Sequence, residues 1–285
     1  MNIISRYTSP SLNRLRPFGS RLFDISRCSM ATHDNSGYPL VLHSSADPTT
    51  LGGTAICGFS TVGSVGVIAM SHIIQTLDLD PMGTVLHPEF PAIALIHESV
   101  PKHPVRVYQG DGLGIFIAEI QFPPQNDVHF GETVLEWFTK GGFDRLIVID
   151  GVVSNDLGIK EESDLWGVSS TAIGRDALDK SNIQRIQQGI VSGISGYLIA
   201  EGERRGLDVT ALLAECNPMY PDARAALLAI EGVCDLIDLE IPVKGLLEDA
   251  RAIEERVREA FERAQANALP APEDQDDDDE VRMVY

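Results

Sequence analysis

The stretch from Gln188 to Asp238 constrains the fold more than any other part of the chain. Apolar residues 189–191 are predicted to form a short strand that runs into a glycine-rich turn at residues 192–196. A helix follows and ends near Gly206, because a residue without a Cβ can adopt the left-handed conformation that closes a helix. Residues 209–215 then form a second strand, and a second helix follows. The order strand, turn, helix, strand, helix predicts an open α/β sheet.

The glycine-rich turn invites comparison with known phosphate-binding loops. Its glycines, Gly189, Gly193 and Gly196, match neither the dinucleotide fingerprint nor the P-loop. Ser192 and Ser195 lack the flanking glycines of a nucleophile elbow. We therefore interpret the turn as small residues that let the helix pack closely on the sheet. The alternative is an anion site at the helix N-terminus, where free backbone N–H groups gather.

Two segments of the same stretch, GISGYLIAEGERRGLDVTALLAE and YPDARAALLAIEGVCDLIDL, resemble the archaeal form of the proteasome assembly chaperone family. Three upstream segments follow in the order that this family shows: residues 116–124, 136–138 and 146–151. The resemblance covers residues 40 to 260 approximately, and its motifs are specific together rather than singly.

The resemblance implies a fold, an assembly and a function. The implied fold is α/β: a three-layer α/β/α sandwich of the phosphorylase/hydrolase-like type, with a mostly parallel central sheet. The implied assembly is a homo-oligomer, and the implied function is to help build or engage the proteasome core particle. The expected partners are therefore core-particle subunits and further copies of the chain. The family carries no established catalytic residues.

The charge of the chain is strongly acidic. Its formal net charge is −20, with five lysines against seventeen arginines. An acidic, lysine-poor surface suits a protein that stays soluble in concentrated salt, so a halophilic cytoplasm is our preferred interpretation and an acidic mesophilic protein is the alternative. Non-specific nucleic-acid binding is disfavoured, because phosphates need a basic surface.

Cofactor, metal and membrane signals are weak throughout. The four cysteines, at positions 28, 57, 216 and 234, form no C-x-x-C pair and predict neither a zinc site nor a disulfide framework. No apolar run reaches the roughly 18 residues of a membrane span. We expect no cofactor, no metal and no membrane partner.

Further elements follow from apolar periodicity and from turn residues. Gly63 and Gly66, in the first turns of one predicted helix, suggest close packing on a sheet. The main expected elements are a strand at 54–59, a helix at 62–77 capped by Ser60 or Thr61, a hairpin of strands 105–108 and 115–122, a helix at 128–140 and a strand at 146–149.

Asp150 and Gly151 lie at the carboxyl end of the last of these strands, where α/β folds place ligands. Asp150 is therefore the best single candidate for a functional carboxylate, and a turn-initiating Asp before Gly is the alternative. A ligand pocket near this strand end would be formed by Asp150, Ser192, Gly193, Ser195 and Gly196. No catalytic residue is assigned.

The two ends of the chain differ from its body. Residues 1–29 carry five arginines and one acid, so they are predicted to be disordered and are interpreted as a misassigned start before Met30, with a transit peptide as the alternative. Residues 30–267 are predicted to form one α/β domain that ends in a long helix from Pro242, with an apolar stripe.

The predicted tail, residues 268–285, contains the acidic run EDQDDDDE and is expected to be disordered. Its last residues, Met283, Val284 and Tyr285, are apolar again and are predicted to bind a partner. Archaeal proteasome activators end in a hydrophobic residue, tyrosine and one last residue, whereas Tyr285 is itself terminal. The match is therefore displaced by one residue.

Three functional hypotheses remain at this point. The leading one is a non-enzymatic, cytoplasmic chaperone or adaptor for the proteasome core particle. The second is an enzyme of nucleoside-phosphorylase or carboxylate–amine ligase type with a pocket near Asp150. The third is a structural homo-oligomer whose tail serves only solubility.

Overall fold

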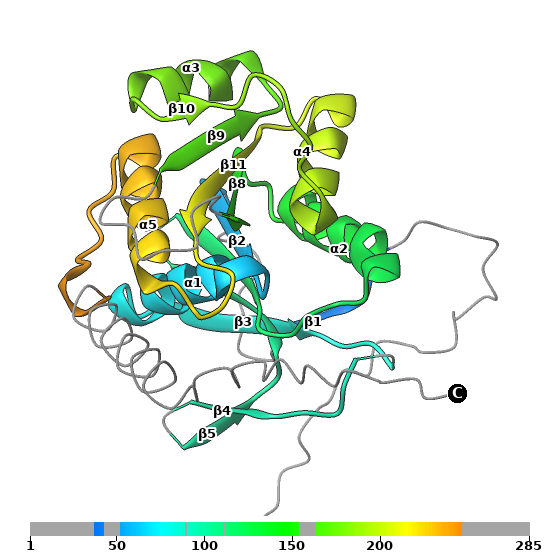
Figure 1. The fold of residues 1–285 in the computed structure, drawn as a ribbon. Helices are drawn as coiled ribbons and strands as arrows, with labels where there is room; N and C mark the ends of the chain where they lie inside the picture. Colours follow the sequence, from blue (N-terminus) through cyan, green and yellow to red (C-terminus); the bar gives the residue numbers. More distant parts are fainter. Residues whose placement is uncertain are drawn as a thin grey trace, which may run out of the picture. The chain divides into compact units, whose positions relative to one another are not determined.

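A nine-stranded mixed sheet is the centre of the fold (Figure 1). The computed structural model describes residues 37–42, 52–88, 90–97, 99–110, 112–153 and 164–246. Across the sheet the strands are β1 (Leu40–Leu42), β3 (Asp80–Val85), β6 (Val105–Gly110), β7 (Leu113–Ala118), β2 (Thr54–Phe59), β8 (Arg145–Val153), β11 (Val209–Cys216), β9 (Leu165–Ser169) and β10 (Gln184–Arg185). The four neighbours β7, β2, β8 and β11 run parallel, and antiparallel strands flank them.

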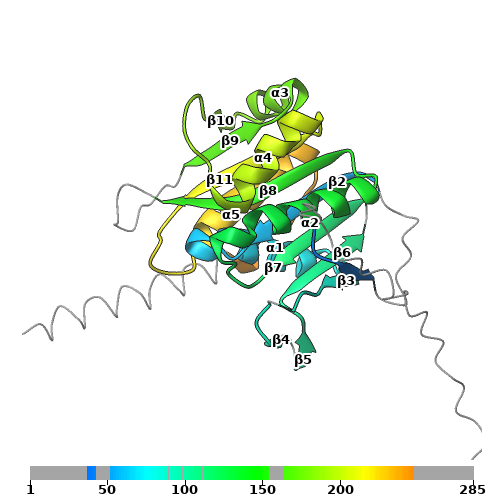
Figure 2. The same cartoon turned by 90° about the vertical axis from the view of Figure 1, so that its right-hand side faces the viewer.

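Helices cover both faces of this sheet, which gives three layers (Figure 2). One face carries α1 (Val65–Thr76) and α5 (Ala223–Ile237), and the other carries α2 (Asp127–Lys140) and α4 (Gly193–Arg205). Helix α3 (Ala172–Lys180) packs on β9, where the Leu178 side chain faces Gly167. The predicted α/β/α fold with a mostly parallel centre is confirmed.

Strand β8 shows how the sequence builds two cores. Ile147 and Ile149 belong to the cluster under α1 and α5, whereas Leu146 and Val148 belong to the cluster under α2 and α4. Successive side chains of a strand point to opposite faces, so a continuous apolar run is needed where both faces are covered. Both layers of the core therefore depend on the same short segment.

Helix α1 approaches the sheet so closely that only glycine fits at the crossing. A Cβ on Gly66 would lie 2.6 Å from the Ile149 carbonyl oxygen and 2.8 Å from the Phe59 nitrogen. Because both are backbone atoms, a side chain could not be accommodated by a rotamer change. The predicted packing role of Gly66 is confirmed.

The predicted helix 62–77 is wrong at its start. Residues 62–64 form a short 3-10 turn, and both Gly63 (φ 61°) and Ser64 (φ 50°) adopt left-handed conformations before α1 begins at Val65. The Gly63 carbonyl accepts a 2.7 Å hydrogen bond from the Asp222 N–H, which fixes this geometry. The expected cap residue Thr61 makes no cap and donates its hydroxyl to Asp150 instead.

The start of the stretch 188–238 also differs from the prediction. Residues 189–191 form no strand, and the predicted turn from Gly193 to Gly196 is the first turn of α4. Gly196 faces the Val191 carbonyl at a distance that leaves no space for a Cβ. Gly196 therefore lets the preceding segment pass close to the helix, rather than letting the helix pack on the sheet. The end of α4 is as predicted, with Gly206 at φ 68°.

A smaller ribbon stands apart from the main sheet (Figures 1 and 2). It consists of β4 (Leu95–His97) and β5 (Val100–Lys102), which pair antiparallel. Ile96 at its centre is largely exposed.

Several predictions lie outside the described residues: the segments 1–29 and 268–285, the tail residues Met283, Val284 and Tyr285, and the long helix beyond Leu246. Within the described part of the chain, the helices are too short or too polar to span a membrane. The same part contains no cluster of three or more His, Cys, Asp or Glu residues suited to a metal ion.

Candidate functional site

Asp150 lies where β8 extends beyond its neighbour β2. The last pair between these strands joins Gly58 to Ile149, whereas β8 continues beside β11 as far as Val153. The predicted strand end at Ile149 is therefore too early, because pairing with β11 extends the strand. The side chain of Asp150 is buried, with 8% of the residue exposed.

Three donors surround the Asp150 carboxylate. Its Oδ2 accepts a 2.5 Å hydrogen bond from the Ser195 hydroxyl, in the first turn of α4. Its Oδ1 accepts from the Thr61 hydroxyl and, at 2.8 Å, from the Gly151 N–H. Burial raises the pKa of the Asp150 carboxyl, and the hydrogen bonds from Ser195, Thr61 and Gly151 oppose that shift.

The structure brings together two of the five residues predicted to line a pocket. Asp150 and Ser195 are 45 positions apart and hydrogen-bonded. Ser192 and Gly193 are exposed at the start of α4, and Gly196 contacts the Val191 backbone. The Asp150 cluster consists of Asp150 with its donors Thr61, Gly151 and Ser195. It joins β8, the turn after β2 and α4, so its hydrogen bonds have the geometry of a structural link between these elements. The ligand pocket proposed from the sequence stays a prediction.

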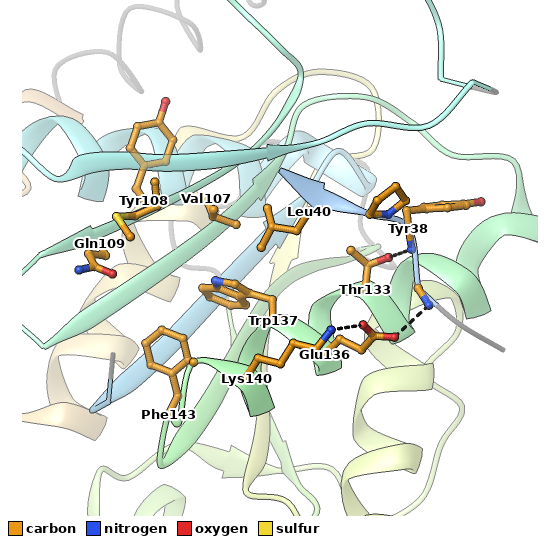
Figure 3. Close-up of a pocket in the computed structure, with 14 residues that line it drawn as sticks. Tyr38, Leu40, Val107, Tyr108, Gln109, Thr133, Glu136, Trp137, Lys140 and Phe143 are labelled. Carbon is orange, nitrogen blue, oxygen red and sulfur yellow. Dashed lines mark hydrogen bonds and ion pairs between the residues drawn. The ribbon is translucent and has the colours of Figure 1, made fainter. Parts of the chain in front are cut away.

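Sequence reasoning missed a second site, a cavity beside α2 (Figure 3). Its volume is about 380 Å³. The lining comes from four places: residues 37–40, Met82 on β3, residues 107–109 on β6, and α2 with the loop after it, including Thr133, Glu136, Trp137, Lys140, Gly141 and Phe143. The Trp137 and Phe143 rings, whose centroids are 5.0 Å apart, form much of one wall.

Polar groups hold one side of this cavity together. The Tyr38 N–H donates to the Thr133 hydroxyl at 2.6 Å, which attaches the 37–40 segment to α2. Glu136 accepts from the Gly37 N–H at 3.2 Å and from the Lys140 ammonium at 2.8 Å. The hydrogen bond from Lys140 is the main cause that lowers the pKa of Glu136.

One signal in the sequence could have pointed to this cavity. Glu136, Trp137 and Lys140 lie within five residues on one helix, so they combine opposite charges with the largest aromatic side chain. The contribution of Gly37, Tyr38 and the β6 residues depends on tertiary structure and carries no local signal.

Comparison with known proteins places these features in a family. The model of the PAC2 family matches residues 55–260, which is more than half of the chain. The chain belongs to the PAC2 family. The matched PAC2 region contains the Asp150 cluster and the α2 side of the cavity, whereas the segment 37–40 lies before it.

Solved structures and a sequence relative agree with this assignment. Pyrococcus furiosus PbaA, described as an archaeal homolog of proteasome-assembly chaperone, is 28% identical, with a TM-score of 0.71 over 81% of this chain and 94% of that one. Pyrococcus furiosus PbaB, described as an archaeal proteasome activator, shares the fold at 23% identity and a TM-score of 0.66, over 79% and 99% of the two chains. An uncharacterized Methanocaldococcus jannaschii protein is 25% identical over 205 residues, 72% of this chain and 84% of its own length.

Proposed function

We propose that this PAC2 protein is a non-enzymatic chaperone or adaptor that assists assembly of the proteasome core particle or binds it. The observation that carries the proposal is the likeness to PbaA, which extends over most of both chains at 28% identity. The Asp150 cluster is consistent with it, because the carboxylate is occupied by hydrogen bonds that join structural elements. The family match does not favour the phosphorylase-like or ligase-like alternative.

The proposal includes a cytoplasmic location, in a cell with a salt-rich interior, and assembly into a homo-oligomer. Its support is the net charge of −20 and the apolar stripe that the sequence predicts after Pro242. Light scattering in concentrated salt tests the assembly. A clean monomer under conditions that keep the protein folded would contradict it.

The proposed contact with the core particle uses Met283, Val284 and Tyr285. Tyrosine brings a large apolar ring with one polar group, and a terminal carboxylate can make a charge-assisted hydrogen bond to a basic partner. A second attachment point elsewhere on the protein would raise the local concentration of these residues.

A pull-down with core-particle α subunits, with and without residues 268–285, tests the proposed function. Capture by the full chain is the expected result, and failure of both forms to capture any subunit would overturn it. A binding titration of the wild type, Tyr285→Ala and a form without residues 281–285 then tests the contact. We expect weaker binding by both variants with an unchanged oligomer, and equal affinity of all three would reduce the tail to a solubility device.

A further inference from the structure

The cavity beside α2 combines an apolar interior with a pair of opposite charges. Leu40, Val107, Trp137 and Phe143 provide apolar and aromatic surface (Figure 3). Glu136 and Lys140 lie together at one side. A volume of about 380 Å³ falls in the range of small-molecule sites, which are mostly apolar with a few placed polar groups.

The ion pair at this cavity can be opened at little cost. The side chains of Lys140 and Glu136 are 77% and 41% exposed and lie four residues apart on α2. Exposed pairs of this kind contribute little to stability, because water already screens both charges. The Gly37 N–H holds the Glu136 carboxylate at the cavity independently of Lys140. A ligand can therefore take up both charges without disturbing the fold.

We propose that this cavity binds a free amino acid with an apolar side chain. The α-carboxylate pairs with the Lys140 ammonium, and the α-ammonium pairs with the Glu136 carboxylate. The side chain enters between Trp137, Phe143 and Val107. Charge-assisted hydrogen bonds are stronger than neutral ones, and here the ligand makes one with each charge.

The arrangement selects a zwitterion over singly charged molecules. An apolar acid would bring its carboxylate beside that of Glu136, and an apolar amine would bring its ammonium beside that of Lys140. A neutral molecule would leave the existing pair in place and gain no charged contact. Only a ligand with both charged groups on the same carbon atom matches both residues. This inference is independent of the proposed contact with the proteasome.

Calorimetric titration of the full chain with three matched ligands tests the proposal. L-leucine carries both charges, L-leucinamide lacks the carboxylate and 4-methylpentanoate lacks the ammonium. We expect L-leucine to bind about threefold to fivefold more tightly than either analogue, since each analogue loses one charged contact to a partly exposed side chain. The chain has two tryptophans, so a Trp166→Phe variant leaves Trp137 as the reporter, and its emission should change with L-leucine.

Two variants test which residue binds each charged group of the ligand. Lys140→Met should abolish the preference for L-leucine over L-leucinamide, and Glu136→Gln should abolish the preference over 4-methylpentanoate. Lys180→Met is the matched control, because Lys180 ends α3 as Lys140 ends α2, and it should change none of the three affinities.

The proposal is overturned by any of three results. The first is no heat and no change in Trp137 emission with L-leucine or L-phenylalanine up to about 10 mM. The second is equal affinity of the three leucine-related ligands for the wild type. The third is an unchanged order of affinities in both the Lys140→Met and the Glu136→Gln variants.

Discussion

The two faces of the sheet are built from different kinds of side chain. Under α1 and α5 the buried cluster is aliphatic, with alanines along α5 and Tyr108 as its one buried aromatic residue within the described part of the chain. Under α2 and α4 the buried cluster contains seven aromatic residues: Tyr38, Phe59, Phe116, Phe130, Trp137, Phe138 and Phe143. The sheet is the same, so the difference comes from the residues that face it.

This difference changes how the elements on each face contact one another. Small residues on the first face allow backbone to approach backbone, as at Gly58 and Gly66. Rings on the second face pack edge to face, as Phe116 does with Trp137. The cavity and the Asp150 cluster both lie on this second face.

The largest expected effect concerns the first face. Gly66→Ala should lower the free energy of unfolding by about 4 kcal/mol, because the new methyl group meets backbone atoms that cannot move aside. Urea denaturation measures the change. Gly245→Ala is the control, since a Cβ there would meet no atom of the described residues within 4 Å, and at this helical position, where Ala is favoured over Gly, it should lose no stability. A similar loss in both variants would refute the packing argument.

On the second face, Asp150→Ala should cost about 3 kcal/mol, because it leaves the donors of Thr61, Ser195 and Gly151 without their acceptor. The same denaturation assay applies. Asp176→Ala, on the exposed side of α3, is the matched control and should have a negligible effect. If Asp150→Ala unfolded at the same urea concentration as the wild type, the cluster would not be a stabilising link between these elements.

Gly131→Ala, on the second face, contrasts with Gly66→Ala on the first. A Cβ on Gly131 would contact the Tyr197 ring, which can move more readily than the backbone atoms at Gly66 although its hydroxyl is held by Glu132. We therefore expect a loss of about 2 kcal/mol, below that of Gly66→Ala. If Gly131→Ala proved as costly as Gly66→Ala, the proposed difference between backbone and ring contacts would not hold.

The smallest expected effect is on pH dependence. Because burial raises the pKa of Asp150, its stabilising contribution is complete below the ordinary value of 3.8 and is lost as the pH rises through the raised pKa. Asp150→Asn carries no charge, so its stability relative to the wild type should increase across this interval and then become constant. Unfolding curves of both proteins from about pH 3.5 to pH 7 measure the difference. A decrease in that relative stability with rising pH would contradict the assignment.

The sequence predicts elements better than it predicts contacts between them. The strand at 54–59, the helix before Lys140 and the strand from Val209 were all located, because apolar periodicity and glycine stops are local signals. Asp150 and Ser195 were both singled out, but their hydrogen bond joins positions that only the fold brings together.

The errors have the same origin. The helix expected from Val62 begins at Val65, because tertiary contacts with Asp222 hold Gly63 in a left-handed conformation. Residues 189–191 are apolar, but Ile190 is almost fully exposed instead of entering the sheet. The cavity beside α2 combines the 37–40 segment with residues from three later elements, so no single stretch of sequence predicts it.

The shortness of the edge strands of the central sheet has a consequence for self-association. Its outermost strands are very short, three residues in β1 and two in β10. Unpaired backbone groups of a long edge strand can recruit strands from other molecules and start fibrous aggregates, and short edge strands offer few such groups. Among the described residues, strand addition is therefore disfavoured at both sides of this sheet, and helical faces or the β4–β5 ribbon are better suited to an orderly assembly of copies.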